Sequence, residues 1–301
     1  MLAPVVLFVY NRSEQLQQVL NCLNDNAMAS DTDLYIFSDG PKREKDIEKV
    51  EKVRIILEKF RVDNHFKSVT VYASQENRGL ARSVINGVSE IVSKYGKVIV
   101  LEDDLIVAKD FLQFMNQGLE FYRDDERVGA ISGYSLPIKL KKTSADKSVY
   151  KSRTGNSWGW ATWVDIWNKV DWGDTWYDSF LNDTKRQKEF DKVQYGISNM
   201  LKEQIAGKID SWAVRWDYHF FMNGLCTIYP PKSKIQNVGF GQDGTHTHNE
   251  NDEKKDVLAK EGNVQFIEYD QLVDMTVETA KSFKMPFWKK VIEWLKSKGG
   301  I

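Results

Sequence analysis

The chain has 301 residues, with 42% hydrophobic and 28% charged residues, which excludes a disordered, collagen-like or coiled-coil protein. Lysine and arginine total 42 against 43 acidic residues, so no overall positive charge favours nucleic acid, and we expect no nucleic-acid partner. Two cysteines exclude a disulfide scaffold. No apolar stretch reaches the ~18 residues of a membrane span, and the start of the chain lacks a signal-peptide pattern. The simplest expected location is the cytoplasm.

Short apolar runs alternate with amphipathic stretches over residues 1–135. Five runs have the length and β-branched or aromatic content of strands: Val5–Tyr10, Leu34–Ser38, Val69–Ala73, Val98–Leu101 and Val128–Ser132. Helical spacing of apolar residues separates them: Ser13 to about Leu23 with Ser13 as the cap, Lys42–Phe60, Leu80–Tyr95 and Phe111–Tyr122. This alternation predicts an α/β fold with a doubly wound, mainly parallel sheet, in which ligands bind at the carboxyl ends of the strands.

The composition changes in the second half. A Lys-rich segment over residues 135–157 is interpreted as a loop or boundary, and eight of the ten tryptophans follow between Trp158 and Trp216. Helices are expected over Phe180–Gln204 and Ser211–Asn223, before a short strand and a Gly-, Asn- and His-rich loop. We divide the chain into an α/β half (1–135), an aromatic-rich half (136–250), and a linker with a C-terminal helix (251–301).

The C-terminal stretch Phe283–Lys298 has the spacing of an amphipathic helix. Its apolar residues share one face, and lysines flank them. This pattern is typical of a helix that lies in a membrane interface near anionic lipid. A terminal helix docked on the rest of the protein fits equally well, so both interpretations stay open.

Three acids, Glu102, Asp103 and Asp104, directly follow the apolar run that ends at Leu101. Like charges at the end of a buried strand are unfavourable unless a cation or hydrogen-bond donors offset them. A hard divalent ion such as Mn²⁺ or Mg²⁺ prefers carboxylate oxygens and bridges readily to a diphosphate. The alternative is a solvated strand end with acids that cap the next helix. The position at the carboxyl end of a central strand favours ligand binding.

Other polar loops are expected to open onto the same crevice. Asn11 and Arg12 follow the first strand, Asp39 follows the second, and Arg78 precedes a helix. Arginine suits phosphate or a base carbonyl, and aspartate suits donors on a base or ribose. Taken singly, each has an ordinary structural explanation: a surface charge, a turn or a helix N-terminus. Their convergence favours a nucleotide-binding crevice.

The run VIVLEDDLIVAKDFLQFM is similar to the Glu-Asp-Asp strand and helix of the N-acetylglucosaminyltransferase I type of glycosyltransferase, a GT-A enzyme. Further stretches that resemble this family follow the same order along roughly residues 4 to 248. FVYNRSEQL and IFSDG resemble its nucleotide-contacting loops, and NSWGWATWVDIW its Gly-Trp segment. RWDYHF and YPPKSKIQNVGFGQDGTH resemble its Trp-Asp helix and its late strand and Gly-to-His loop.

The resemblance implies inverting transfer of a sugar from a nucleotide diphosphate, assisted by Mn²⁺ (or Mg²⁺). By position, Asp104 would contact the metal, Asp103 the ribose and Glu102 the donor sugar. Arg12 and Asp39 would contact the nucleotide. UDP-linked N-acetylglucosamine is the donor that the resemblance suggests, although small side-chain changes near Glu102 could select another sugar.

Asp217, in the pair Trp216-Asp217, matches the carboxylate that acts as general base in the family. An inverting transfer needs one carboxylate within hydrogen-bond reach of the acceptor hydroxyl. The family motif has two consecutive acids after the tryptophan, whereas Tyr218 follows Asp217 here. Asp210, seven residues earlier, is therefore the alternative base.

His246, in GQDGTHTH, is a candidate additional metal ligand or diphosphate contact. The glycines of this loop suit closure over a diphosphate, and a plain flexible connector is the alternative. Most of the tryptophan cluster is expected to be core, with Trp158 or Trp160 lining the sugar site.

The sequence thus predicts a cytoplasmic glycosyltransferase, held at the inner face of the cell membrane if the terminal helix binds lipid. Its acceptor would be a glycan or a lipid-linked oligosaccharide. A nucleotidyltransferase acting on sugar phosphates is one alternative, but it usually has a Gly- and Lys-rich loop after the first strand, where this chain has NRSEQ. A noncatalytic carbohydrate-binding protein is another. A metal phosphohydrolase would leave the aromatic half unexplained.

Overall fold

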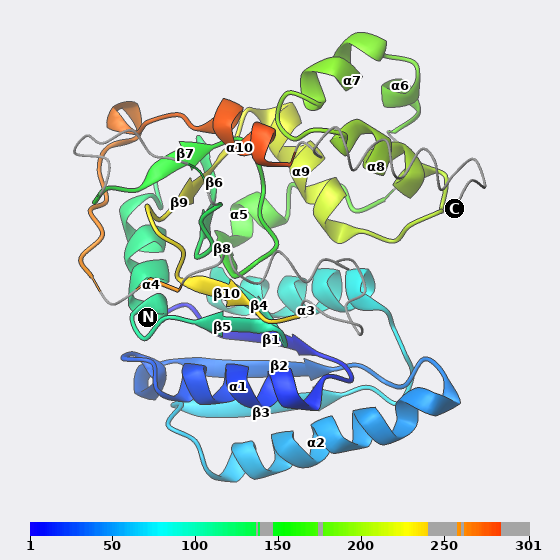
Figure 1. Ribbon diagram of the computed structural model, residues 1–301, viewed down its shortest axis with the longest axis vertical. Coiled ribbons are helices and arrows are strands. Elements are labelled where there is room, and N and C mark those ends of the chain that lie inside the picture. The colour runs from blue at the N-terminus through cyan, green and yellow to red at the C-terminus, as the bar shows by residue number, and fades with distance from the viewer. Residues whose placement is uncertain (137, 139–146, 174–176, 240–257, 260–261, 284–301) are drawn as a thin grey trace, which may run out of the picture.

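The computed structural model describes residues 1–136, 138, 147–173, 177–239, 258–259 and 262–283 (Figure 1). His246, the rest of the Gly- and His-rich loop and the C-terminal stretch after Phe283 lie outside the described residues.

One eight-stranded sheet runs through the described part of the chain, in the order β3-β2-β1-β4-β8-β6-β9-β7. Its strands are β1 (Val5–Val9), β2 (Asp33–Ser38), β3 (Ser68–Ala73), β4 (Lys97–Glu102), β6 (Val128–Ser132), β7 (Tyr150–Ser152), β8 (Trp160–Trp163) and β9 (Cys226–Tyr229). Strands β8 and β7 run antiparallel to their neighbours, and the other pairings are parallel. The predicted doubly wound, mainly parallel sheet is confirmed. Because β8 lies between β4 and β6, the two expected halves share this sheet.

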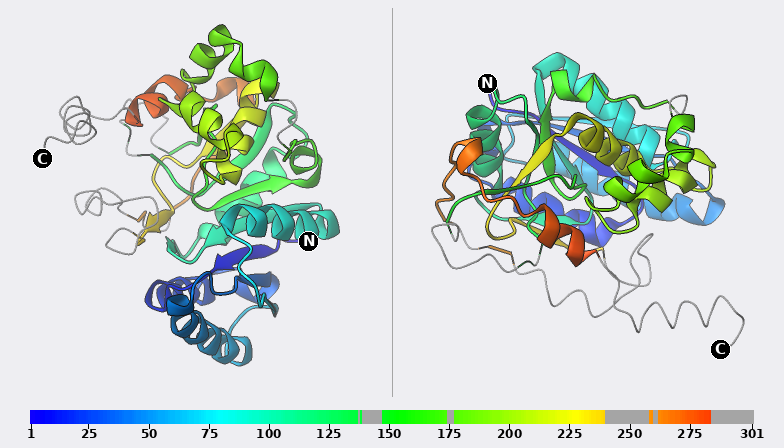
Figure 2. Two further views of the ribbon diagram at one scale, coloured as in Figure 1. Left: turned by 90° about the vertical axis from the view of Figure 1, so that its right-hand side faces the viewer. Right: turned by 90° about the horizontal axis from the view of Figure 1, so that it is seen from above.

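The helices cover both faces of the sheet (Figures 1 and 2). The longer ones are α1 (Ser13–Asn24), α2 (Ile47–Val62), α3 (Leu80–Tyr95), α4 (Phe111–Phe121) and α9 (Trp212–Asn223). A Cβ at Gly118 of α4 would meet Ile131 of β6, whereas a Cβ at Gly129 of β6 would meet Phe220 of α9. Helices α4 and α9 therefore both pack on β6. All five residues of β1 are buried, as expected for a strand with both faces covered.

Most expected elements of the first half lie within a few residues of their observed bounds, and two expectations are corrected. Arg12, not Ser13, is the N-cap of α1, and Ser13 is its first helical residue. The single helix expected over Phe180–Gln204 is three: α6 (Asp178–Leu181), α7 (Thr184–Phe190) and α8 (Ile197–Ile205). Asp183 starts a new helix by accepting a hydrogen bond from the Arg186 amide. Gly196, at φ 79°, separates α7 from α8.

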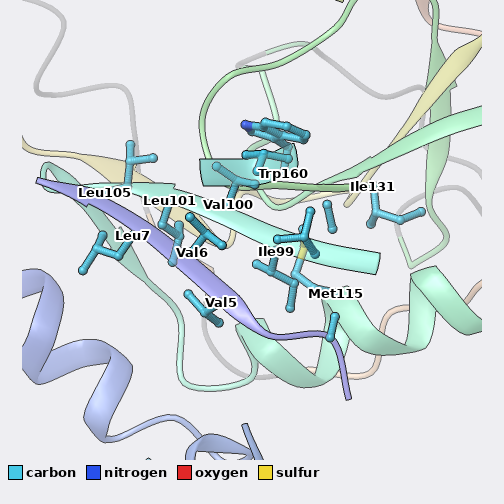
Figure 3. Packing of buried hydrophobic residues seen from close by; sticks show 14 of the residues in the cluster. Val5, Val6, Leu7, Ile99, Val100, Leu101, Leu105, Met115, Ile131 and Trp160 are labelled. Atoms are coloured by element: carbon cyan, nitrogen blue, oxygen red, sulfur yellow. The ribbon is translucent and has the colours of Figure 1, made fainter. Parts of the chain in front are cut away.

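The hydrophobic core is built around the adjacent strands β1, β4 and β8 and the helices that cover them. Figure 3 shows Val5, Val6 and Leu7 of β1 beside Ile99, Val100 and Leu101 of β4, with Trp160 of β8 next to Val100. Two further tryptophans from other elements continue this packing: Trp167 of α5 (Val164–Trp167) and Trp216 of α9, with ring centroids 5.6 and 5.5 Å from that of Trp160. This core fixes the ends of β1 and β4, where the acidic triplet lies.

Two further features frame the carboxyl end of β4 and the edge of the sheet. Strand β5 (Leu105–Val107) follows the acidic triplet and pairs with β10 (Ile235–Asn237). Residues 265–282, which include α10 (Thr276–Ser282), run along the edge strand β7 and bond to Lys151 of this strand and to Val149 just before it. Figure 1 shows α10 in red beside β7. This C-terminal segment covers an edge that would otherwise expose unpaired backbone groups.

Candidate active site

The predicted crevice lies at the carboxyl ends of β1, β2 and β4. Phe8 of β1 lies opposite Glu102 of β4 in the parallel register, so the loops after both strands start side by side. The Tyr10 amide donates to Asp103 Oδ2 at 3.0 Å. Arg12 Nη1 lies 2.5 Å from Asp104 Oδ2 and 3.7 Å from Asp103 Oδ1. The structure therefore brings Arg12 and the acidic triplet together, as the sequence predicts.

The acidic triplet carries more negative charge than its surroundings balance. Burial, and then the charges of Asp104 and Asp103, together raise the pKa of Glu102 to about 8. Burial and the charge of Asp104 also raise the pKa of Asp103 to about 7, against the lowering effect of Arg12. When all three acids are ionised, the single positive charge of Arg12 offsets one of their three negative charges. The site then has a net charge of minus two. The site is therefore electrostatically suited to a divalent cation.

The donor chemistry at Asp104 also fits a hard divalent ion. Mg²⁺ and similar ions often bind proteins through one or two carboxylates and complete their shell with substrate phosphates and water. Within the described ranges, no group of three or more His, Cys, Asp or Glu side chains has the arrangement of a metal cage. Asp104 would therefore hold the ion together with the diphosphate rather than within a full protein shell.

Gly239 packs directly on Asp104. The Val238 amide donates to the Asp104 carbonyl at 2.8 Å, and a Cβ at Gly239 would lie 2.2 Å from Asp104 Oδ2. Only glycine fits this contact without displacing the carboxylate. The first glycine of the Gly- and His-rich stretch therefore lies against Asp104. His246, which belongs to the same stretch, lies outside the described residues.

Asp39 ties two crevice loops together. Its Oδ1 accepts from the amides of Gly40 and Arg78 at 2.9 and 2.8 Å, and its Oδ2 accepts from the Gly79 amide and Asn77 Nδ2, both at 3.0 Å. These donors give Asp39 a role in fixing the loop that leads into α3. The Arg78 side chain is exposed beside this loop. A contact of either residue with nucleotide stays a prediction.

Asp217 is a buried carboxylate on α9. Its residue is 8% exposed, and Oδ1 accepts a 2.7 Å hydrogen bond from the Gly155 amide. Burial raises the pKa of Asp217 to about 7, partly offset by that hydrogen bond. The Asp210 side chain is instead 65% exposed and lies 3.1 Å from Arg215 Nη2. The pKa of Asp217 lies in the range that suits a general base, whereas Asp210 is mostly exposed and pairs with the buried Arg215.

The loop over residues 155–159 lies between Asp217 and the end of β4. At the start of the loop, the Gly155 amide contacts the Asp217 carboxylate. At its end, a Cβ at Gly159 would lie 3.3 Å from Leu101, the residue before Glu102. Four residue steps separate Gly155 from Gly159, which span at most about 14 Å. One short loop therefore contacts both the Asp217 carboxylate and the strand that leads into the acidic triplet.

Comparison with known families places the chain in one of them. The GNT-I family model matches residues 1–206, more than half of the chain. The chain belongs to the GNT-I family. This confirms the resemblance to that family described above. No curated protein matches the chain.

Several solved structures are similar to this GNT-I family member. One is the crystal structure of S. aureus TarS 1-349, at 11% identity and a TM-score of 0.46, covering 79% of this chain and 61% of that one. The same TarS fragment in complex with UDP matches at 12% identity and a TM-score of 0.42, covering 78% and 60%. This chain thus spans less than two thirds of the length of these proteins.

The GNT-I family match includes the crevice loops and the acidic triplet but ends before Asp217. The general-base assignment therefore depends on the burial and contacts of Asp217. Among the described residues, no helix is both long and apolar enough to span a membrane.

The tryptophan cluster requires one correction. Trp160 is 1% exposed, and its ring stacks on Trp167 and Trp212, so it belongs to the core and presents no face to a sugar in this structure. The strand position of Trp160 directs its ring between β8 and α9. Trp158 is half-buried and packs edge-on against Tyr134, with ring centroids 4.7 Å apart.

Sequence reasoning missed two glycines of the site, Gly155 and Gly239. Both act through the space that they leave for a carboxylate, and such a contact joins residues 62 and 135 positions apart. Gly239 belongs to a glycine-spaced loop that the sequence had singled out, which is a partial signal. Gly155 lies within the stretch 135–157 that the sequence indicates as a loop or boundary, and nothing in its neighbours indicates Asp217.

Proposed function

We propose that this GNT-I family glycosyltransferase is an inverting, metal-assisted enzyme that transfers a sugar from a nucleotide diphosphate to a hydroxyl of a glycan or lipid-linked oligosaccharide. The observation that carries the proposal is the buried Asp217, whose carboxylate is held by Gly155 at one end of a short loop, while Gly159 at the other end packs on Leu101 beside the acidic triplet. A single buried base near a donor site is what inversion requires.

Asp217 acts as the base, and the acidic triplet binds the donor. Asp217 Oδ1 is held by the Gly155 amide, which leaves the other carboxylate oxygen to accept the proton of the acceptor hydroxyl. With a pKa near 7, Asp217 is both ionised in useful amount at neutral pH and basic enough to take a proton. In this proposal Glu102 binds the donor sugar and Asp103 binds the ribose.

Mn²⁺ or Mg²⁺ bound beside Asp104 would neutralise charge on the departing diphosphate. Arg12 contacts the same carboxylate, so it lies where a second positive charge can face the phosphates. Asp39 holds the loop that borders this crevice, and Arg78 projects from that loop. UDP-linked N-acetylglucosamine is the first donor to test, and other UDP-sugars follow.

Two measurements test this function. A thermal-shift screen of nucleotide sugars with and without Mn²⁺ identifies the donor, because a ligand that binds the folded state raises the apparent Tm. With that donor, Asp217→Asn is expected to abolish sugar transfer and to leave donor affinity near that of the wild type. Near-normal transfer by Asp217→Asn would show that another group is the base. Donor binding without release of the nucleotide would favour a noncatalytic carbohydrate-binding protein.

We also propose that the enzyme works at the cytoplasmic face of a membrane, on the strength of the basic amphipathic stretch Phe283–Lys298. Its test is a chain that ends after Phe283, which retains α10. We expect this chain to keep the activity on soluble acceptors and to bind less to vesicles that contain anionic lipid. Equal vesicle binding by both chains would assign the stretch to a docked terminal helix.

A further inference from the structure

One peptide unit links Asp217 to two distant parts of the chain. The Gly155 N–H donates to Asp217 Oδ1, and the Thr154 C=O accepts from the Tyr229 hydroxyl, both at 2.7 Å. These two groups belong to the same planar peptide, so they point in opposite directions within one rigid unit. The Tyr229 hydroxyl bond therefore helps to set the direction in which the N–H meets the carboxylate. Hydrogen bonds at both ends also polarise the peptide and strengthen each other.

The side chain of Thr154 is held from the C-terminal segment. Its hydroxyl lies 3.3 Å from that of Thr279 in α10 and donates to the Val193 carbonyl at 3.0 Å. The Ser152 hydroxyl lies 2.7 Å from that of Thr279 and accepts from the Thr154 amide at 3.2 Å. Ser152, Thr154 and Thr279 are fully buried. The amide, the side chain and the carbonyl of Thr154 are thus all fixed by buried partners.

Asp217 depends on this unit for its orientation. Across the described part of the chain, the Gly155 amide is the hydrogen-bond donor that contacts its carboxylate. This contact is also tightly packed, because a Cβ at Gly155 would lie 2.3 Å from Asp217 Oδ1 and 3.3 Å from the Trp216 ring. A small rotation of the 154–155 peptide would therefore turn the carboxylate or leave it without its donor.

We propose that Tyr229 and Thr279 are positioning residues for Asp217, acting through the Thr154–Gly155 peptide unit. This inference rests on the proposed role of Asp217 as general base. Both residues lie beyond residues 1–206, so the family match assigns them no part. The consequence is that the C-terminal segment, which covers the sheet edge, also sets the rate of transfer.

Tyr229→Phe has a matched control in Tyr150→Phe. The two rings stack with centroids 5.2 Å apart and an interplanar angle of 9°, and both residues are buried. The Tyr150 hydroxyl lies 3.1 Å from the Ser135 hydroxyl and away from the 154–155 peptide. Each variant removes one buried hydroxyl and its hydrogen bond. A general loss of stability should therefore be similar in both.

We expect Tyr229→Phe to lower kcat for transfer by about tenfold to about 100-fold, the range caused by small misplacements of a catalytic group. Donor Kd should stay at the wild-type value, because the crevice loops are unchanged. Amide hydrogen exchange at Gly155 should become faster, while exchange in β1 stays the same. Tyr150→Phe should keep kcat and Gly155 exchange close to the wild type. Thr279→Val should lower kcat, and Thr279→Ser should restore it.

Equal kcat in Tyr229→Phe and Tyr150→Phe would overturn the proposal, as would unchanged exchange at Gly155. The experiment includes Asp217→Asn to separate this failure from that of the proposed function. Loss of transfer in Asp217→Asn with normal kcat in Tyr229→Phe and Thr279→Val would reject the positioning role alone. Full transfer by Asp217→Asn would reject the base assignment, and the positioning role with it.

Discussion

Replacing Asp217 by Asn should stabilise the protein at alkaline pH while it removes the activity. Burial raises the pKa of Asp217 from 3.8 to about 7. Below pH 3.8 the carboxyl group is protonated in both the folded and the unfolded chain, and it has no effect on the pH dependence. As the pH rises from 3.8 to 7, the unfolded chain loses this proton and the folded protein retains it. Stability therefore falls through this window and is constant above it.

The size of this effect follows from the shift. One pKa unit corresponds to 1.36 kcal/mol, so about three units give on the order of 4 kcal/mol at pH 8. The asparagine side chain of the variant has no charge in either state and avoids this penalty. Its amide group makes its own contacts, which add a constant to the difference between the proteins. The slope of that difference with pH is unaffected, because the remaining titratable groups are common to both.

Urea unfolding of both proteins at several pH values from 4.5 to 8 measures the slope. We expect the advantage of Asp217→Asn to grow by about 3 kcal/mol over this range, close to the change in the penalty of the wild-type carboxylate. Sugar transfer by the same sample should be absent at each pH. A difference in unfolding free energy that stays flat between pH 5 and 8 would refute the argument, because it would mean that Asp217 titrates normally in the folded protein.

Four further predictions follow from other contacts in the structure. The wild-type kcat/KM should rise with pH through about 7, the pKa of Asp217, and a limb near pH 4 would contradict the base assignment. Gly155→Ala, whose Cβ would lie 2.3 Å from Asp217 Oδ1, should lower kcat at least tenfold without weakening donor binding; calorimetry with the donor is the control. Gly239→Ala and Asp104→Ala should both lose the Mn²⁺-dependent part of UDP binding, and unchanged titrations would place the ion elsewhere. Lys234→Met removes the 2.6 Å partner of Asp110 and should cost about 3 kcal/mol in urea unfolding, with part of the loss recovered by adding Asp110→Asn.

The sequence by itself determined the framework of the donor site. Strand-length apolar runs alternate with amphipathic helices, and this local pattern is enough to predict a parallel sheet because each element must bury its apolar side. Parallel strands end at one edge, so the convergence of Arg12 and the acidic triplet followed from the pattern without coordinates. The observed ion pair between Arg12 and Asp104 agrees with that convergence.

Only the tertiary structure decided how Asp217 is held and which tryptophan is accessible. The Gly155 amide reaches Asp217 from 62 positions away, and Tyr229 and Thr279 act on Thr154 across 75 and 125 positions. A sequence pattern reports which face of an element is apolar, but it does not report which distant backbone group meets that face. The same limit explains Trp160, whose aromatic ring suits a sugar site and a core equally well. Its burial is set by the packing of α5 and α9 on β8, which depends on chain segments that no local pattern connects.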